Sequence, residues 1–172
     1  MEAEMKDFKL NKFKIEHIFS YSVEVDPNMF IQKLPTKDTR VTGNITGGTV
    51  WGPKVNGKIL PMGADWSVVH PNGIVDVDCR AMIETNDGAH INMFYTGRID
   101  LGSEQAAEDY SNGKFPPVMG TQPKHVLDCD DPRYEWVNRV SCFCIGRVDF
   151  TGDPIVIQYD VYSFYATPFE ED

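Results

Sequence analysis

The segment Gly47 to Trp66, GGTVWGPKVNGKILPMGADW, ends with an acidic and an aromatic residue. Together these two side chains could transfer a proton and stabilise a cation. The two residues, Asp65 and Trp66, place a carboxyl group next to a large apolar ring. A carboxyl group in an apolar pocket has a raised pKa and can exchange protons near neutral pH. The glycines and prolines before it favour tight turns. The segment therefore predicts two turns that lead to a candidate catalytic acid.

A hairpin signal predicts the partner of Asp65. Asn72-Gly73 is typical of a two-residue hairpin loop, and counting outward from that loop places Asp65 opposite Arg80. Asp78 lies two residues from Arg80 and competes for the same guanidinium group. Two interpretations remain open. The pair is either exposed and contributes ~0–1 kcal/mol, or Asp65 is a pocket carboxylate with a shifted pKa.

A second turn predicts the register of the next two strands. Thr85-Asn86-Asp87-Gly88 is typical of a type I turn with a glycine bulge, and this three-residue loop pairs Ile83 with Ile91. The two hairpins predict one polar and one apolar face. The polar face is either solvated or lines a wet cavity, with the apolar face then covered by a partner subunit. The polar face contains Asp65, Ser67, Asp76, Asp78, Arg80, Glu84, His90 and Asn92, and the apolar face contains Trp66, Val68, Val75, Val77, Cys79, Ala81, Ile83, Ile91, Met93 and Tyr95.

Hydrophobic residues alternate with a period of two along most of the chain, which predicts strands. In residues 13–25 the odd positions share one face, and similar segments occur at 40–51, 58–70, 74–85, 89–100, 134–148 and 155–166. One helix is expected between Ser103, a favourable N-cap, and Gly113, which ends it. Asp26-Pro27 also resembles a helix start, followed by a turn or two at most. These features predict an all-β fold, a barrel or a sandwich, in a single domain over residues 1–172.

Composition excludes several kinds of partner. The 172 residues have a formal net charge of -10, so binding to nucleic acid or to an anionic membrane surface is not expected. The sequence has no apolar run near the ~20 residues of a membrane helix. The polar N-terminal segment lacks the apolar core of a secretory signal, and we therefore expect a cytoplasmic protein.

The cysteines and acidic residues do not form a recognisable metal motif. Cys142 and Cys144 share one strand face, but a second close Cys or His pair that would complete a zinc site is missing. The Asp-Cys-Asp-Asp run at 128–131 lacks the spacing of an EF-hand. We expect Cys79, Cys129, Cys142 and Cys144 to be core residues, with no metal and no cofactor bound.

The segment 133–139, RYEWVNR, is expected to begin a strand. Tyr134, Trp136 and Asn138 would then share one face. Two rings and an amide suit the wall of a ligand pocket, and they suit core packing near a barrel mouth equally well.

Four motifs in fixed order, GGTVWGP, PMGADW, TNDGAHI and DPRYEWVNR, resemble a family of small β-barrel proteins of bacteria and fungi that is known as a domain of unknown function. The resemblance covers roughly residues 13–163, nearly the whole chain. It implies a closed antiparallel barrel of about eight or more strands with one short helix, similar to allene oxide cyclase and the lipocalins. It also implies an activity, because some fungal members are cofactor-free cyclases that add a phenol across a prenyl alkene (hydroalkoxylation).

The leading hypothesis is a cofactor-independent cyclase of natural-product biosynthesis that acts on a small apolar aromatic substrate. Asp65 would protonate the alkene, and aromatic rings would stabilise the cation. Arg80 would position Asp65. Protonation of the alkene requires a raised pKa of Asp65, whereas an ion pair with Arg80 would lower that pKa. If Asp65 stays ionised, it would instead act as a base on the phenol. Asp65 and Trp66 can line one cavity only if a bulge intervenes. The candidate catalytic residues are Asp65 and Arg80, and the candidate substrate-binding residues are Trp66, Glu84, His90, Phe94, Tyr134, Trp136 and Asn138.

Two alternatives remain open. The barrel could bind an apolar ligand without turning it over, or its interior could be packed solid and serve only assembly. A homo-oligomer such as a dimer is consistent with an apolar sheet face that needs cover.

Overall fold

The structure is a computed structural model that describes residues 13–166. The segment that suggested a cytoplasmic location lies outside this range. Within the range, no helix is long and apolar enough to cross a membrane. The elements are β1 Phe13–Val25, β2 Phe30–Lys33, β3 Thr39–Trp51, β4 Gly57–Ile59, β5 Ala64–Val69, β6 Ile74–Thr85, β7 His90–Asp100, α1 Glu104–Ser111, β8 Val118–Thr121, β9 Lys124–Asp128, the 3-10 helix η1 Glu135–Arg139, β10 Ser141–Asp149 and β11 Ile155–Ala166.

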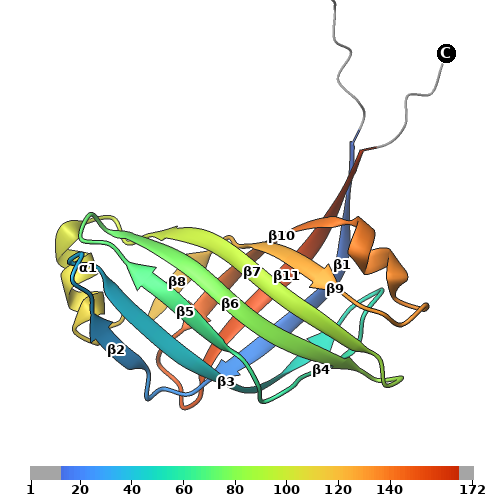
Figure 1. The fold of residues 1–172 in the computed structure, drawn as a ribbon, viewed down its shortest axis with the longest axis horizontal. Coiled ribbons are helices and arrows are strands. Elements are labelled where there is room, and N and C mark those ends of the chain that lie inside the picture. Colours follow the sequence, from blue (N-terminus) through green and yellow to red (C-terminus); the bar gives the residue numbers. More distant parts are fainter. Residues whose placement is uncertain (1–12, 167–172) are drawn as a thin grey trace, which may run out of the picture.

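The strands form one closed antiparallel barrel (Figure 1). Neighbours follow the order β1-β11-β10-β9-β7-β6-β4-β3, and pairing between β1 and β3 closes the ring. β5 lies between β3 and β6, β8 extends the sheet beside β10, and β2 pairs with β3. The predicted all-β barrel with one short α-helix is confirmed. A barrel of about eight strands has an interior that side chains fill or that holds one small ligand.

The two helices lie at opposite ends of the barrel (Figure 1). α1 begins after Ser103, whose hydroxyl oxygen accepts a hydrogen bond from the N–H of Ala106 at 3.1 Å, and Gly113 follows its end with φ of 78°. Both signals that predicted this helix are confirmed. At Asp26 no helix follows. The carboxylate accepts a bond from the N–H of Asn28 at 2.8 Å and forms a bend instead.

The loop between β5 and β6 has one residue more than the sequence predicted. The N–H of His70 donates to the carbonyl of Ile74 at 2.8 Å, and Gly73 follows the turn with φ of 93°. Asp65 therefore pairs with Cys79, and Arg80 pairs with Ala64. A shift of one residue moves every side chain of a strand to the other face. The predicted pairing of Asp65 with Arg80 is wrong for this reason.

The β6–β7 turn has the predicted three-residue form. Ile83 pairs with Ile91, and Gly88 has φ of 87°. The apolar residues of both strands face the barrel interior, while their polar residues face outward. The interpretation in which the polar face lines a cavity is therefore wrong for β6 and β7. The shifted register of β5 turns Asp65 and Ser67 inward and Trp66 outward, the reverse of the predicted faces. Because the barrel itself covers the apolar face, the reason given for a dimer no longer holds, and the dimer stays a prediction.

The core follows the alternation with one interruption. A bulge between His17 and Phe19 moves Phe19, Tyr21 and Val23 inward but leaves His17 on a different face. The prediction that all odd positions of β1 share one face is therefore wrong. All four cysteines are buried and free, as expected for core residues.

Three short strands, β2, β8 and β9, were not predicted. They lie at residues 30–33, 118–121 and 124–128, where no strand was expected. The segment 134–140 is not a strand: η1 forms there, after a turn in which the N–H of Tyr134 donates to the carbonyl of Asp131 at 2.9 Å. Local contacts to Asp131 thus replace the sheet pairing that the alternation suggested.

Candidate active site

Asp65 fills a gap in the barrel wall. Strand pairing passes from Asp65–Cys79 directly to Val68–Asp76. In between, the hydroxyl of Ser67 donates to Asp65 Oδ1 at 2.7 Å, and the backbone N–H groups of Ser67 and Asp78 also bond to the carboxylate. The side chain thereby satisfies donors that the sheet leaves unpaired.

Burial raises the pKa of Asp65 to about 6. The hydrogen bonds from Ser67 and Asp78 favour the ionised form and oppose this effect, while the negative charge of Asp78 adds to it. A carboxyl group with such a pKa is present in both protonation states near neutral pH. It can therefore give or take a proton under physiological conditions.

The raised pKa makes stability depend on pH. In the unfolded chain an aspartate titrates near pH ~3.9, so the folded state binds the proton more tightly and is favoured at low pH. This contribution is complete below about pH 4 and is lost as pH rises through about 6. The unfolding free energy of Asp65→Asn minus that of the wild type is therefore expected to be about 2 kcal/mol larger at pH 7.5 than at pH 4, because only the wild type loses this contribution. Urea unfolding of both proteins at the two pH values measures this difference. Parallel pH dependence in the two proteins would contradict the raised pKa.

Aromatic rings surround the interior near Asp65. Tyr95 stacks on His125 with ring centroids 4.4 Å apart, Tyr21 lies 5.0 Å from Tyr159, and all four rings are buried. Burial raises the pKa of Tyr95 and of Tyr159, and the charge of Asp65 raises both further. These phenols therefore stay neutral and lie within electrostatic reach of the acid.

His125 organises this ring. Its Nε2 lies 2.6 Å from Tyr21 Oη, and its Nδ1 lies 2.9 Å from Cys144 Sγ. Burial lowers the pKa of His125 to about 3, so the imidazole is neutral. A neutral imidazole has one donor and one acceptor nitrogen, and here both are engaged. His125 therefore positions its neighbours rather than offering a free base.

The other predicted catalytic residue, Arg80, lies on the outer face. Its guanidinium group lies over the rings of Trp66 at 5.6 Å and Phe94 at 5.0 Å, and 58 % of its side chain is exposed. Arg80 forms an ion pair with Asp78, whose Oδ1 lies 3.2 Å from Nη1. Of the two carboxylates expected to compete for the guanidinium group, Asp78 is therefore the one that binds it. Trp66, Arg80 and Phe94 are thus brought together, but on the opposite side of the wall from the interior. The expectation that Trp66 and Asp65 point to opposite faces is confirmed.

Glu84 and His90 also lie on the outside. Glu84 pairs with Lys58 at 2.9 Å, and His90 Nε2 lies 3.7 Å from the second oxygen of Glu84. Both are partly or largely exposed, and neither joins the residues around Asp65.

The DPRYEWVNR motif builds the end of the barrel opposite α1. Tyr134 donates to the carboxylate of Asp87 at 3.0 Å, and Arg133 pairs with the same carboxylate at 3.0 Å. Asn138 bonds to both the N–H and the carbonyl of Cys129, at 2.8 and 2.7 Å. These contacts fix η1 against the β6–β7 turn. The TNDG and DPRYEW motifs therefore have a structural role, which is to hold this end of the barrel together.

Trp136 belongs to the same end of the barrel. It packs against the core, with the ammonium group of Lys54 5.2 Å from its ring centroid. Tyr134, Trp136 and Asn138 therefore lie together, as expected, but they do not join the residues around Asp65.

Sequence reasoning missed most of the interior polar groups. Tyr95 was expected only as a residue of the apolar face, and Tyr21, Tyr159 and His125 were not identified as candidates. The available signal was the alternation of His125, Leu127 and Cys129 with polar or exposed residues, which marks a strand with an inward histidine.

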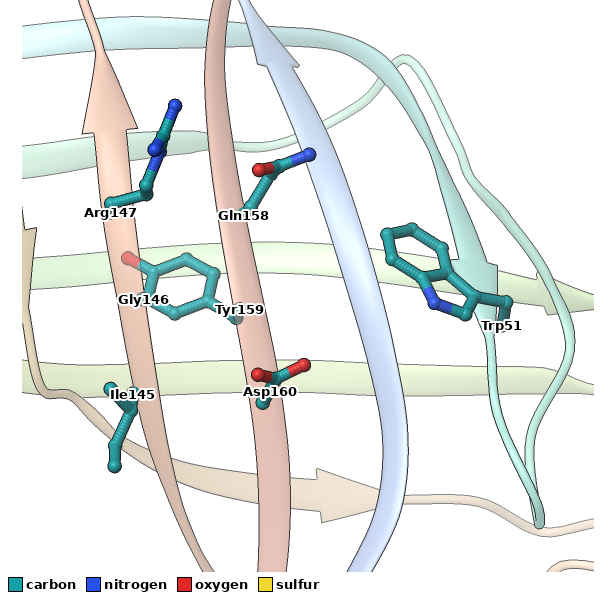
Figure 2. Close-up of a pocket in the computed structure, with 7 residues that line it drawn as sticks. All are labelled: Trp51, Ile145, Gly146, Arg147, Gln158, Tyr159 and Asp160. Atoms are coloured by element: carbon teal, nitrogen blue, oxygen red, sulfur yellow. The ribbon is translucent and has the colours of Figure 1, made fainter.

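A groove of about 350 Å³ lies on the outer face of β10 and β11 (Figure 2). It is lined by Arg147, Gln158 and Asp160, with Trp51 from β3 at its edge. Ser20 donates to Asp160 at 2.6 Å, and His17 Nε2 lies 2.9 Å from the same hydroxyl. Because the serine proton is directed at Asp160, His17 is not placed as its base, and this cluster is not a nucleophilic triad.

Comparison with known families gives a match over residues 13–164 to the family described as "Protein of unknown function (DUF3237)". The chain belongs to this family. A relative named UPF0311 protein, from Clostridium acetobutylicum, is 28 % identical over 142 residues, which is 81 % of this chain and 89 % of the relative. A UPF0311 protein of Bradyrhizobium diazoefficiens is 35 % identical over 91 residues, 53 % of this chain and 55 % of that protein.

Solved structures share the barrel. A β-barrel-like protein from Acinetobacter baumannii superposes with a TM-score of 0.73 at 25 % identity, over 92 % of this chain and all of that one (coverage 100 %). A structure described as an enzyme from Penicillium herquei gives a TM-score of 0.66 at 18 % identity, over 94 % of this chain and 100 % of that one. At that identity the second likeness establishes the fold alone.

Proposed function

We propose that this protein is a cofactor-independent cyclase that closes an oxygen ring by adding a phenol to a prenyl alkene. The observation that carries the proposal is the position of Asp65, which pairs with the inward residue Cys79 and accepts a hydrogen bond from Ser67, where burial raises its pKa to about 6. Alkene protonation needs an acid that is still protonated near neutral pH, and burial supplies it. The enzyme from Penicillium herquei that shares the fold supports catalysis in a barrel of this kind.

The reaction balances without a cofactor. The proton of Asp65 is transferred to one alkene carbon, and the π electrons form the new C–H bond. The tertiary carbocation that results is stabilised by aromatic rings, and Tyr95 and Tyr159 are rings within electrostatic reach of Asp65. A lone pair of the phenol oxygen forms the C–O bond, and the phenol proton returns to the Asp65 carboxylate. Substrate and product therefore have the same mass.

Arg80 has no role in this sequence of steps. Because its guanidinium group pairs with Asp78 outside the barrel, it does not lower the pKa of Asp65. The conflict between an Arg80 ion pair and a protonated Asp65 disappears with the corrected register.

Incubation with ortho-prenylphenol in deuterated buffer tests the proposal. We expect a cyclic ether that carries one deuterium at the protonated alkene carbon, detected by mass spectrometry and proton NMR. Binding without conversion would overturn the cyclase proposal and favour the alternative of a binding barrel. Absence of both binding and conversion would reject both functions for this substrate class.

A further inference from the structure

A cavity of about 400 Å³ lies between α1, the end of β7 and β8, at the α1 end of the barrel. Such a volume is at the lower end of the range for small-molecule sites. Its walls are mainly apolar, and charged residues, Asp100, Asp109 and Lys114, contribute to its lining. The apolar wall contains Leu101, Ala106, Tyr110, Phe115, Val118 and Met119.

Aromatic rings form one side of this cavity. Tyr110 contacts Phe115 edge to face, with centroids 4.7 Å apart at 79°, and Phe115 stacks on Phe150 at 5.0 Å and 12°. Aromatic pairs favour these two arrangements. A further planar ring in the cavity can therefore extend the same cluster.

Tyr110 is the most deeply buried ring of the cavity wall. It lines the cavity, yet only 6 % of its surface is exposed. Burial raises the pKa of Tyr110, and the negative charge of Asp65 raises it further. The Tyr110 hydroxyl group therefore stays neutral.

We propose that this cavity binds a planar phenol, with the ring against Tyr110 and Phe115. The assignment of a phenol rests on the proposed function. Lys114 and Asp109, whose charged groups lie 3.5 Å apart, supply a donor and an acceptor for a phenol hydroxyl.

Titration with 2-naphthol, a planar fluorescent phenol, tests the site directly. The wild type is expected to show saturable binding. Ala106→Trp places a large side chain in the cavity from a partly exposed helix position, and it should weaken binding by about tenfold or more. The matched control Val126→Trp adds the same side chain on the outer face of β9 and should change the dissociation constant by less than about twofold.

A second pair of variants keeps the test decisive. Met119→Trp fills the cavity from β8 and replaces Ala106→Trp if circular dichroism shows that the helix variant is not folded. Asp65→Asn should bind 2-naphthol as the wild type does, because Asp65 does not line the cavity. Unchanged binding in folded cavity-filling variants, equal losses in Val126→Trp, or no saturable binding by the wild type would overturn the site. Binding that follows the expected pattern without conversion of ortho-prenylphenol would reject the cyclase and leave the site standing.

Discussion

Asp65→Asn is expected to lower the turnover of ortho-prenylphenol by about 10²–10⁴-fold, the usual contribution of a general acid or base. Asparagine has a similar shape and can still accept a hydrogen bond from Ser67, which now donates to Asp65 Oδ1. It has no proton to transfer to an alkene. Turnover measured by product formation, with binding of the substrate determined separately, isolates the loss to the chemical step. A variant that retains turnover would remove Asp65 from the mechanism.

The pH profile distinguishes the two roles open to Asp65. If the protonated carboxyl is the acid, activity falls about tenfold per unit as pH rises above about 6, because the protonated fraction falls in that proportion. If the carboxylate is a base on the phenol, activity rises through the same range. The pH dependence of kcat/KM in the wild type separates these outcomes by sign.

Arg80→Gln separates the corrected register from the one that the sequence suggested. With Arg80 on the outer face, turnover should stay within about threefold of the wild type, as for other surface changes. With Arg80 beside Asp65, the loss would approach that of Asp65→Asn. A large loss in Arg80→Gln would therefore contradict the structural assignment of the site.

His125→Ala is expected to destabilise the fold by about 3–5 kcal/mol. His125 is 1 % exposed, so the substitution leaves a cavity in the stack with Tyr95. It also leaves the buried Tyr21 hydroxyl and the Cys144 thiol without their imidazole partner. An unsatisfied buried group adds its own penalty to that of the cavity. Equilibrium unfolding in urea measures the change.

His90→Ala provides the matched control. Its side chain is 55 % exposed on the outer face of β7, and the expected change in unfolding free energy is within about 0.5 kcal/mol. If His125→Ala and His90→Ala have equal effects, the buried cluster does not hold the barrel together.

Sequence reasoning recovered the elements that local chemistry determines. The alternation of apolar and polar residues predicted the first and last residues of β6, β7 and β11 to within one position, and the Ser103 N-cap predicted the start of the helix. The register of β6 on β7 was also predictable, because only one loop length pairs Ile83 with Ile91. These predictions needed only neighbours in sequence.

The candidate site was less predictable, because it depends on pairing across the barrel. Asp65 was identified from its residue type and motif, but its neighbours were not. Asn72-Gly73 is typical of a two-residue loop, and counting from that loop placed Asp65 opposite Arg80, whereas the loop in the structure has three residues. His125 and Tyr21 are 104 positions apart, and no periodicity within one strand indicates such a contact.

The register of β5 decides which of its side chains face the interior of the barrel. Strand residues alternate between the two sides of the wall, and β5 is held in register by the β5–β6 loop and by its pairing with both β3 and β6. A shift of β5 by one residue against both neighbours would turn the Trp66 indole inward and the Asp65 carboxyl group toward solvent. Within this architecture, a change of register by one residue would therefore remove the acid from the interior and put an aromatic ring in its place.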